Sequence, residues 1–296
     1  MRNCAERRRT TWDSPPLVFL RREYPERLDV CPSRLYPIAL YPELNNFELA
    51  GLGLVGLAAG TLDTIAGGGG LLTLPALIYA GLPAPLAMAT NKGQSVFGSG
   101  TALARFARSH LFDARRAWVS IVPALVGAGL GVGLLMVLAL RRPALLNPLI
   151  ISLLGAVAVF MIFYRVPQAR PAPVGRRLWA AVPIAFVIAA YDGFLGPGTG
   201  TFLILAYALV FHDPLDCASA NAKLVNFCSN LASMALFAAK GWILWPIALP
   251  MAAGQMAGAL IGARITLRKG KGVVRIVTVF VCLALIGKVA WDFWHG

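Results

Sequence analysis

The chain has few of the residues from which soluble enzymes build catalytic and metal sites. Only 14% of its 296 residues are charged, it has three histidines, and its five cysteines form no CxxC pair. The HExxH and GxSxG motifs are absent, and the glycine run at 67–70 lacks the GK[ST] ending of a phosphate-binding loop. The sequence therefore predicts no disulfide framework, no metal, no cofactor and no enzyme.

Apolar residues, in contrast, make up 58% of the chain, and its mean hydropathy is +0.69. A soluble domain of this length cannot bury so much apolar surface. Several uncharged runs are long enough to cross the hydrocarbon layer of a bilayer, which is about 30 Å thick. We expect an all-α, polytopic integral membrane protein, with eight spans at 47–81, 86–106, 117–140, 144–164, 178–211, 217–239, 241–263 and 273–294.

The formal net charge of +14 is not spread evenly. Arginine and lysine gather in short connections between the apolar runs, for example at 105–116 and 165–177, as they do in membrane proteins. This distribution predicts a lipid bilayer as partner and no nucleic acid. Residues 1–46 differ in composition, since they are rich in arginine, acidic residues and proline. We interpret them as a disordered or mis-started N-terminal extension.

A polar, glycine-rich break occurs twice. Asp63 precedes Gly67–Gly70, and Asp192, 129 positions later, precedes Gly196, Pro197 and Gly198. The motif Pro-x3-Gly-x3-Gly also occurs twice, from Pro123 and from Pro250. These repetitions predict a duplication, with a first transmembrane repeat at 47–164 and a second at 178–294, each of four helices of which one is broken.

Each break is incompatible with a continuous helix. Four consecutive glycines cost about 1 kcal/mol each relative to alanine, and Pro197 removes a backbone donor. Unwound backbone persists at membrane depth only where it is buried in protein or lines a cavity. The half-helices that follow would present free amides and positive dipole ends, which bind anions. If a broken segment counts as one crossing, each half has four spans; if it turns back as an extra crossing, the halves have five spans and inverted topology.

Polar residues around the breaks are the functional candidates, because a charge inside a membrane is costly. A structural interpretation stays open, in which Asp63 pairs with Lys92, Asp192 pairs with Lys223, and Asn226 makes an interhelical hydrogen bond. Asn221 and Lys223 align with Asn91 and Lys92 if Ala222 is an insertion. The predicted substrate-binding residues are Asp63, Gly67, Gly68, Gly69, Gly70, Thr90, Asn91, Lys92, Asp192, Gly196, Gly198, Thr199, Asn221 and Lys223.

The duplicated Asp-x3-Gly-x-Gly break, the stretch Thr90-Asn91-Lys92 and the Pro-x3-Gly-x3-Gly helices resemble the sulfite exporter TauE/SafE family, formerly DUF81, over about residues 47–294. The resemblance implies a multi-pass transporter in the cell (inner) membrane that moves sulfite, a sulfonate or a related small anion. We expect it to be driven by a gradient of protons or cations, with a homo-oligomer left open. The alternatives are an uncoupled anion channel and a membrane-embedded enzyme or assembly partner.

Overall fold

A computed structural model of the chain describes residues 44–142, 152 and 178–269. The predicted spans 144–164 and 273–294 lie outside the described residues, as do residues 1–43. The described part contains no strand and eight α-helices, which confirms the all-α class. The helices are α1 (Asn46–Ala66), α2 (Gly70–Tyr79), α3 (Ala84–Phe106), α4 (Ala114–Arg141), α6 (Ala181–Phe194), α7 (Thr199–Val210), α8 (Leu215–Ala239) and α9 (Trp245–Lys269).

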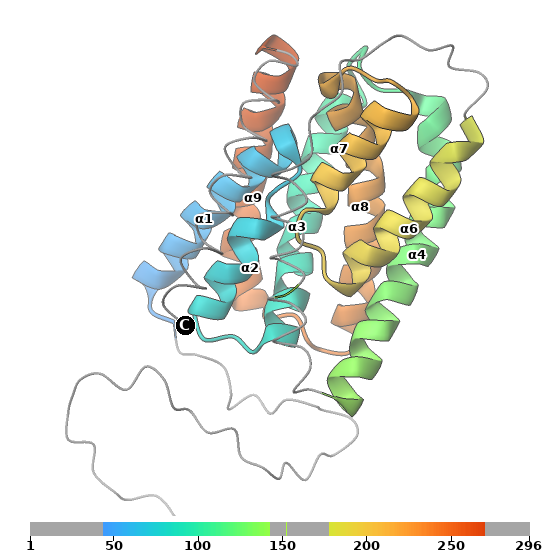
Figure 1. Ribbon diagram of the computed structural model, residues 1–296. Helices are drawn as coiled ribbons and strands as arrows, with labels where there is room; N and C mark the ends of the chain where they lie inside the picture. Colours follow the sequence, from blue (N-terminus) through green and yellow to red (C-terminus); the bar gives the residue numbers. More distant parts are fainter. Residues whose placement is uncertain (1–43, 143–151, 153–177, 270–296) are drawn as a thin grey trace, which may run out of the picture. The chain divides into compact units, whose positions relative to one another are not determined.

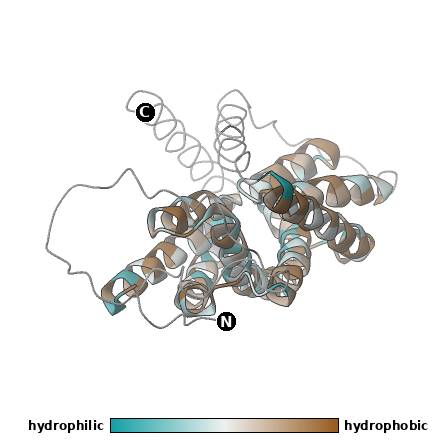
Figure 2. Ribbon diagram, turned by 90° about the horizontal axis from the view of Figure 1, so that it is seen from below, coloured by the Kyte–Doolittle hydropathy of each residue, from teal (hydrophilic) through white to brown (hydrophobic). Residues whose placement is uncertain are grey.

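The distribution of apolar side chains is that of a protein in lipid. Helices α1, α4, α8 and α9 are each long and apolar enough to cross a membrane. On α4, one stripe of large apolar side chains, including Trp118, Val122 and Leu130, is exposed, while the opposite face buries the small residues Ala124 and Ala128. A helix of a soluble protein has the reverse pattern. Figure 2 shows how hydrophobic residues dominate the helices, and the polytopic membrane class is confirmed.

Both predicted helix breaks are present. Helix α1 ends at Ala66 and α2 begins at Gly70, and between them Gly67 has a φ of 78°. In the second half, α6 ends at Phe194 and α7 begins at Thr199, and Gly198 has a φ of 79°. Glycine adopts this left-handed conformation without the steric cost that a Cβ atom brings. The glycines therefore end one helix and let the next begin in a new direction.

The repeated Pro-x3-Gly-x3-Gly motif packs helices closely. A Cβ atom on Gly127 of α4 would lie 2.3 Å from the carbonyl oxygen of Phe186 on α6, and one on Gly254 of α9 would lie 2.0 Å from that of Gly53 on α1. Only glycine allows the two backbones to approach so closely. Figure 1 shows the two pairs, α1 with α9 and α4 with α6. Each pair joins one half of the chain to the other, and the equivalent use of one motif supports the duplication.

Contacts along α9 give the direction of the chain at the first break. On α1, Gly53 lies against Pro250 and Gly60 lies against Gln255, so α1 and α9 are parallel. On α3, Gly93 lies near Ala248 and Gly98 near Gln255, so α3 has the same direction. Helix α2 connects two parallel helices and must run opposite to both. Its ten residues span about 15 Å, half the hydrocarbon layer.

The second break reverses the chain in the same way. Helix α6 is parallel to α4, since Gly127 lies against Phe186 and Gly131 against Ala190. Helix α8 is also parallel to α4, since α8 begins beside the start of α4 and Leu236, near its end, contacts Gly129. Helix α7, which connects α6 and α8, therefore runs in the opposite direction.

The equivalent helices α3 and α8 are antiparallel to each other. Lys92, early in α3, contacts Asn230, late in α8, whereas Gly100, later in α3, lies near Phe227. The helix directions thus agree with the topology in which each break turns back and the two halves are inverted, rather than with one crossing per broken segment. Hydropathy could not distinguish the two topologies, because the length and polarity of a segment do not record its direction.

Candidate functional site

The two breaks lie against each other. A Cβ atom on Gly67 would be 2.1 Å from the carbonyl carbon of Gly200, and one on Gly70 would be 3.6 Å from the Cα of Pro197. The hydroxyl of Thr201 donates a hydrogen bond of 2.7 Å to the carbonyl oxygen of Ala66 across the contact. The first turns of α2 and α7 are therefore brought together from opposite halves of the chain.

A polar cavity is located where the breaks meet. Its lining comes from six helices and both breaks, and it includes eight of the predicted binding residues: Asp63, Gly67, Gly70, Asn91, Lys92, Asp192, Gly196 and Thr199. Four further lining residues were not in the predicted set: Ser95, Gly200, Asn226 and Asn230. Spacing could have found two of them, because Asn226 and Asn230 follow Lys223 at helical intervals and so share its face of α8.

Two buried ion pairs flank the cavity. The Nζ atom of Lys92 lies 2.7 Å from Oδ1 of Asp192, and the Nζ atom of Lys223 lies 2.9 Å from Oδ2 of Asp63. Lys223 also donates to the backbone carbonyl of Asp63. The structural interpretation that paired Asp63 with Lys92, and Asp192 with Lys223, is therefore wrong in its partners. Each lysine pairs with the aspartate of the other half, because the first break packs on α8 and the second on α3.

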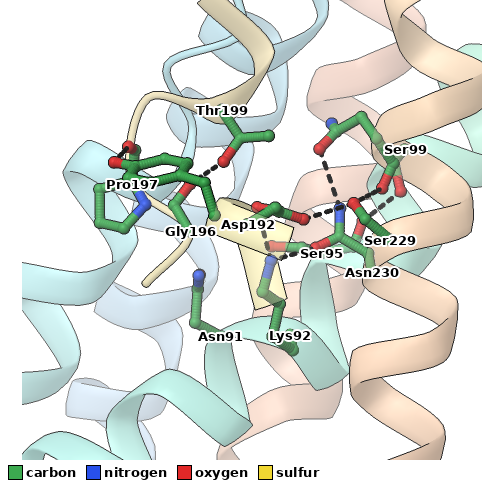
Figure 3. Close-up of polar contacts among 12 residues, drawn as sticks. Asn91, Lys92, Ser95, Ser99, Asp192, Gly196, Pro197, Thr199, Ser229 and Asn230 are labelled. Atoms are coloured by element: carbon green, nitrogen blue, oxygen red, sulfur yellow. Dashed lines mark hydrogen bonds and ion pairs between the residues drawn. The ribbon is translucent and has the colours of Figure 1, made fainter. Parts of the chain in front are cut away.

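Helix α8 connects the two ion pairs into one network. Asn230 accepts a hydrogen bond of 3.1 Å from Lys92 and donates one of 3.2 Å to Asn226, which in turn donates one of 3.3 Å to Asp63. The hydroxyl of Ser229 donates to Asp192. Figure 3 shows Lys92, Asp192, Ser229 and Asn230 together. A change at either ion pair can therefore reach the other through hydrogen bonds alone.

The carbonyl groups that end α1 are all used by protein donors. Those of Asp63 and Ala66 accept from Lys223 and Thr201, and those at positions 64 and 65 accept from the hydroxyl of Ser219. The carbonyls at 64, 65 and 66 are among those that a helix leaves without an intrahelical partner, and the carbonyl of Asp63 also accepts from the amide of Gly67. The negative end of the α1 dipole is therefore compensated inside the protein.

The amides that begin the half-helices are in a different situation. Within the described part of the chain, no protein group accepts a hydrogen bond from the backbone amides of Gly70 and Gly200, and both residues line the cavity. Buried amides without a partner are rare in proteins and are satisfied by water or ligand. Among residues 44–142, 152 and 178–269, no three His, Cys, Asp or Glu side chains come together as a metal site.

Some predicted binding residues lie outside the cavity lining. Gly69 packs on α1, since its Cβ atom would be 2.7 Å from the Cβ of Asp63. Thr90 accepts a hydrogen bond of 3.2 Å from the amide of Leu244, and Asn221 accepts one of 2.7 Å from the amide of Asp113. The remaining residues of this group are Gly68 and Gly198, in the breaks, and Lys223, which reaches the site through its ion pair.

The hydrogen bonds of Thr90 and Asn221 correct the alignment of the halves. Each side chain accepts from the amide of the residue directly before a helix, α9 for Thr90 and α4 for Asn221. Asn221 is thus the counterpart of Thr90, and Lys223 that of Lys92, both at a separation of 131 positions. No insertion of Ala222 is needed, because Ala222 occupies the place of Asn91.

A second cluster of charges ties the start of α4 to the connection between α7 and α8. Arg116 lies 2.6 Å from Asp113 and 2.6 Å from Asp213, and its guanidinium group is 4.7 Å from the ring centroid of Phe211. Partial burial acts to raise the pKa of Asp113, but the hydrogen bonds and charge of Arg116 outweigh it and lower that pKa. This cluster holds two connections together at a distance from the cavity along α4 and α8.

The fold and the buried, charged cavity at two helix breaks define the class of membrane transporters built from broken helices. The chain belongs to the family described as "Sulfite exporter TauE/SafE", whose model matches residues 52–289. It is 35% identical over 247 residues to a "Probable membrane transporter protein" of Haemophilus influenzae, which covers 82% of this chain and 95% of that protein. It is 33% identical to the "Probable membrane transporter protein YfcA" of Escherichia coli K12, over 82% of this chain and 89% of the relative. No solved structure matches the chain.

Proposed function

We propose that this protein is a permease that carries a small anion, namely sulfite, a sulfonate or a related oxyanion, across the cytoplasmic membrane. The observation that carries the proposal is the meeting of two half-helix N-termini and Lys92 at one polar cavity, to which Lys223 is joined through Asp63. Amide groups at a helix N-terminus and lysine ammonium groups both stabilise negative charge. The names of the family and of the relatives, which are those of transporters, support the same class.

Lys92 and Lys223 supply the positive charge, and Asp192 and Asp63 hold the lysine side chains in place while the cavity contains no anion. An anion that competes for the lysines weakens contacts that join the two halves of the chain. Inverted halves of this kind exchange access between the two sides of a membrane by moving against each other. Because ion pairs of 2.7 and 2.9 Å hold the two halves of the chain together beside the cavity, a carrier is favoured over an open channel.

We further propose that a proton gradient drives transport, and that Asp63 is the more accessible of the two aspartates to the coupling ion. The Asp63 side chain is 18% exposed, whereas that of Asp192 is 3% exposed. The charged groups that face Asp63 are Lys223 on α8 and, through space, Lys92 on α3.

Uptake of radiolabelled sulfite, methanesulfonate and sulfate into proteoliposomes tests the proposal. We expect uptake of at least one anion by the wild type, faster when the pH gradient favours proton entry with the anion, and none by Lys223→Met. Gly133→Ala is the control, because no atom lies within 4 Å of the added Cβ. Absence of uptake for every anion in both gradient directions would contradict the proposal, and uptake that ignores the gradient would favour a channel.

A further inference from the structure

The side-chain oxygen of Asn91 contacts two neighbouring polar side chains. Asn91 lies on α3 and is 5% exposed. Its oxygen accepts a hydrogen bond of 2.5 Å from the hydroxyl of Thr73 and one of 2.9 Å from Nε2 of Gln94. With both contacts on the oxygen, the nitrogen of the amide lies on the opposite side.

The nitrogen of Asn91 is directed into the cavity. Figure 3 shows it facing Gly196 and Pro197, and it lies 3.8 Å from the place that a Cβ atom on Gly70 would occupy. Among the described residues, none accepts a hydrogen bond from this nitrogen. Asn91 and the free amide of Gly70 therefore present donors to the same space, one from a side chain and one from the backbone.

In the described part of the other half, the equivalent position carries no such donor. In the corrected alignment the counterpart of Asn91 is Ala222, whose methyl group is buried in an apolar cluster between α8 and its neighbours. The breaks are equivalent, but the side chains beside them are not. The cavity therefore offers one complete set of neutral donors, on the side of α2 and α3.

The charge balance of the cavity limits the charge of a ligand. The two lysines and the two aspartates of the network cancel. The carbonyls that end α1 are bound by protein donors, whereas the first amides of α2 and α7 remain free. Each of the two N-termini, of α2 and of α7, is equivalent to about half a positive charge. Together the ends compensate about one negative charge, and a second charge would stay uncompensated in a medium of low dielectric constant.

We infer that the cavity contains a single subsite for a singly charged oxyanion, in which the Nδ2 of Asn91 and the amide of Gly70 donate hydrogen bonds to the anion beside Lys92. Sulfonates and the singly protonated form of sulfite fit this description, and dianions such as sulfate do not. The inference rests on the proposed function, and it adds the place, the number and the charge of the bound anion.

Two substitutions remove a donor or the space of the subsite. Asn91→Asp keeps an acceptor for Thr73 and Gln94 but removes the donor and adds negative charge. Gly70→Ala places a methyl group where the anion would lie, and the nearest atom, the Cα of Pro197, would be 3.6 Å away, an ordinary contact. Ser99→Ala is the matched control on α3, because the hydroxyl of Ser99 donates only to carbonyls of its own helix.

Calorimetric titration of the protein in lipid nanodiscs with methanesulfonate and with sulfate, at equal ionic strength, measures the prediction. A hydrogen bond to a charged group is worth enough that each substitution should weaken methanesulfonate binding at least about tenfold. We expect the wild type and Ser99→Ala to bind methanesulfonate about tenfold or more tightly than sulfate. Size exclusion and thermal unfolding establish that each variant is folded, and either variant alone is sufficient.

Sulfate binding as tight as that of methanesulfonate would overturn the inference about charge. Unchanged methanesulfonate affinity in folded Asn91→Asp or Gly70→Ala would overturn the subsite. If the wild type carries an anion and both variants carry it equally well, only the subsite is refuted. If the wild type neither binds nor carries any anion, the proposed function is refuted as well. The two failures are therefore distinguishable.

Discussion

Replacing Lys92 by methionine should destabilise the protein strongly. The substitution keeps the length of the side chain but leaves the carboxylate of Asp192, 3% exposed, without the ammonium group that lies 2.7 Å from it. Breaking one partner of a buried ion pair costs about 3–5 kcal/mol. At about 2–4 °C per kcal/mol for proteins of 150–250 residues, the midpoint of thermal unfolding should fall by about 6–20 °C.

The partner of Lys92 is identified by a second substitution. Adding Asp192→Asn removes the stranded charge and should restore part of the loss, with a coupling energy of about 0.5–3 kcal/mol. Adding Asp63→Asn should restore nothing, because Asp63 is paired with Lys223 at 2.9 Å. Thermal unfolding of the single and double variants in one detergent gives the comparison. Greater rescue by Asp63→Asn than by Asp192→Asn would refute the pairing between halves.

Three further outcomes are expected. Gly127→Leu should sharply lower the yield of protein in the membrane, because its Cβ would lie 2.3 Å from a backbone oxygen of α6. Gly133→Leu should leave the yield unchanged, because no atom lies within 4 Å of its Cβ. Equal yields of the two variants would contradict the close packing. Gly67→Ala should also reduce folding, as φ is 78° and the methyl group would lie 2.1 Å from the other break, and normal thermal stability would count against the crossing. Because the pKa of Asp113 is lowered in the fold, its carboxylate stabilises the protein at pH values above 3.8, the ordinary pKa of an aspartate, and this stabilisation is lost as the pH falls further. The difference in unfolding midpoint between wild type and Asp113→Asn should therefore shrink only in strong acid.

The class and the breaks could be predicted from sequence because both depend on local chemistry. Long apolar runs allow only a membrane environment, and Gly67–Gly70 and Pro197 cannot continue a helix, whatever surrounds them. The packing role of Gly127 and Gly254 follows from the spacing of small residues in the same way. For these features the structure adds only the identity of the contacting helix.

The direction of the half-helices and the partners of the charges could not be predicted, since both depend on contacts across the molecule. A segment after a break has the same composition whether it continues or turns back. Lys92 is closer in sequence to Asp63 than to Asp192, yet the inverted halves place it against Asp192. The role of Asn221 was also misjudged, because one shift in the alignment of the halves moves it from the place of Asn91 to that of Thr90.

The central claim is that an anion binds where the two helix breaks meet. An experimental structure of the wild type with bromomethanesulfonate tests it most directly, because anomalous scattering marks the position of the bromine atom. We predict one bromine site in the cavity, with the sulfonate within hydrogen-bond distance of the amide of Gly70 and the Nδ2 of Asn91. Bromine found only elsewhere, such as beside Arg116, in a preparation that carries this anion would contradict the account.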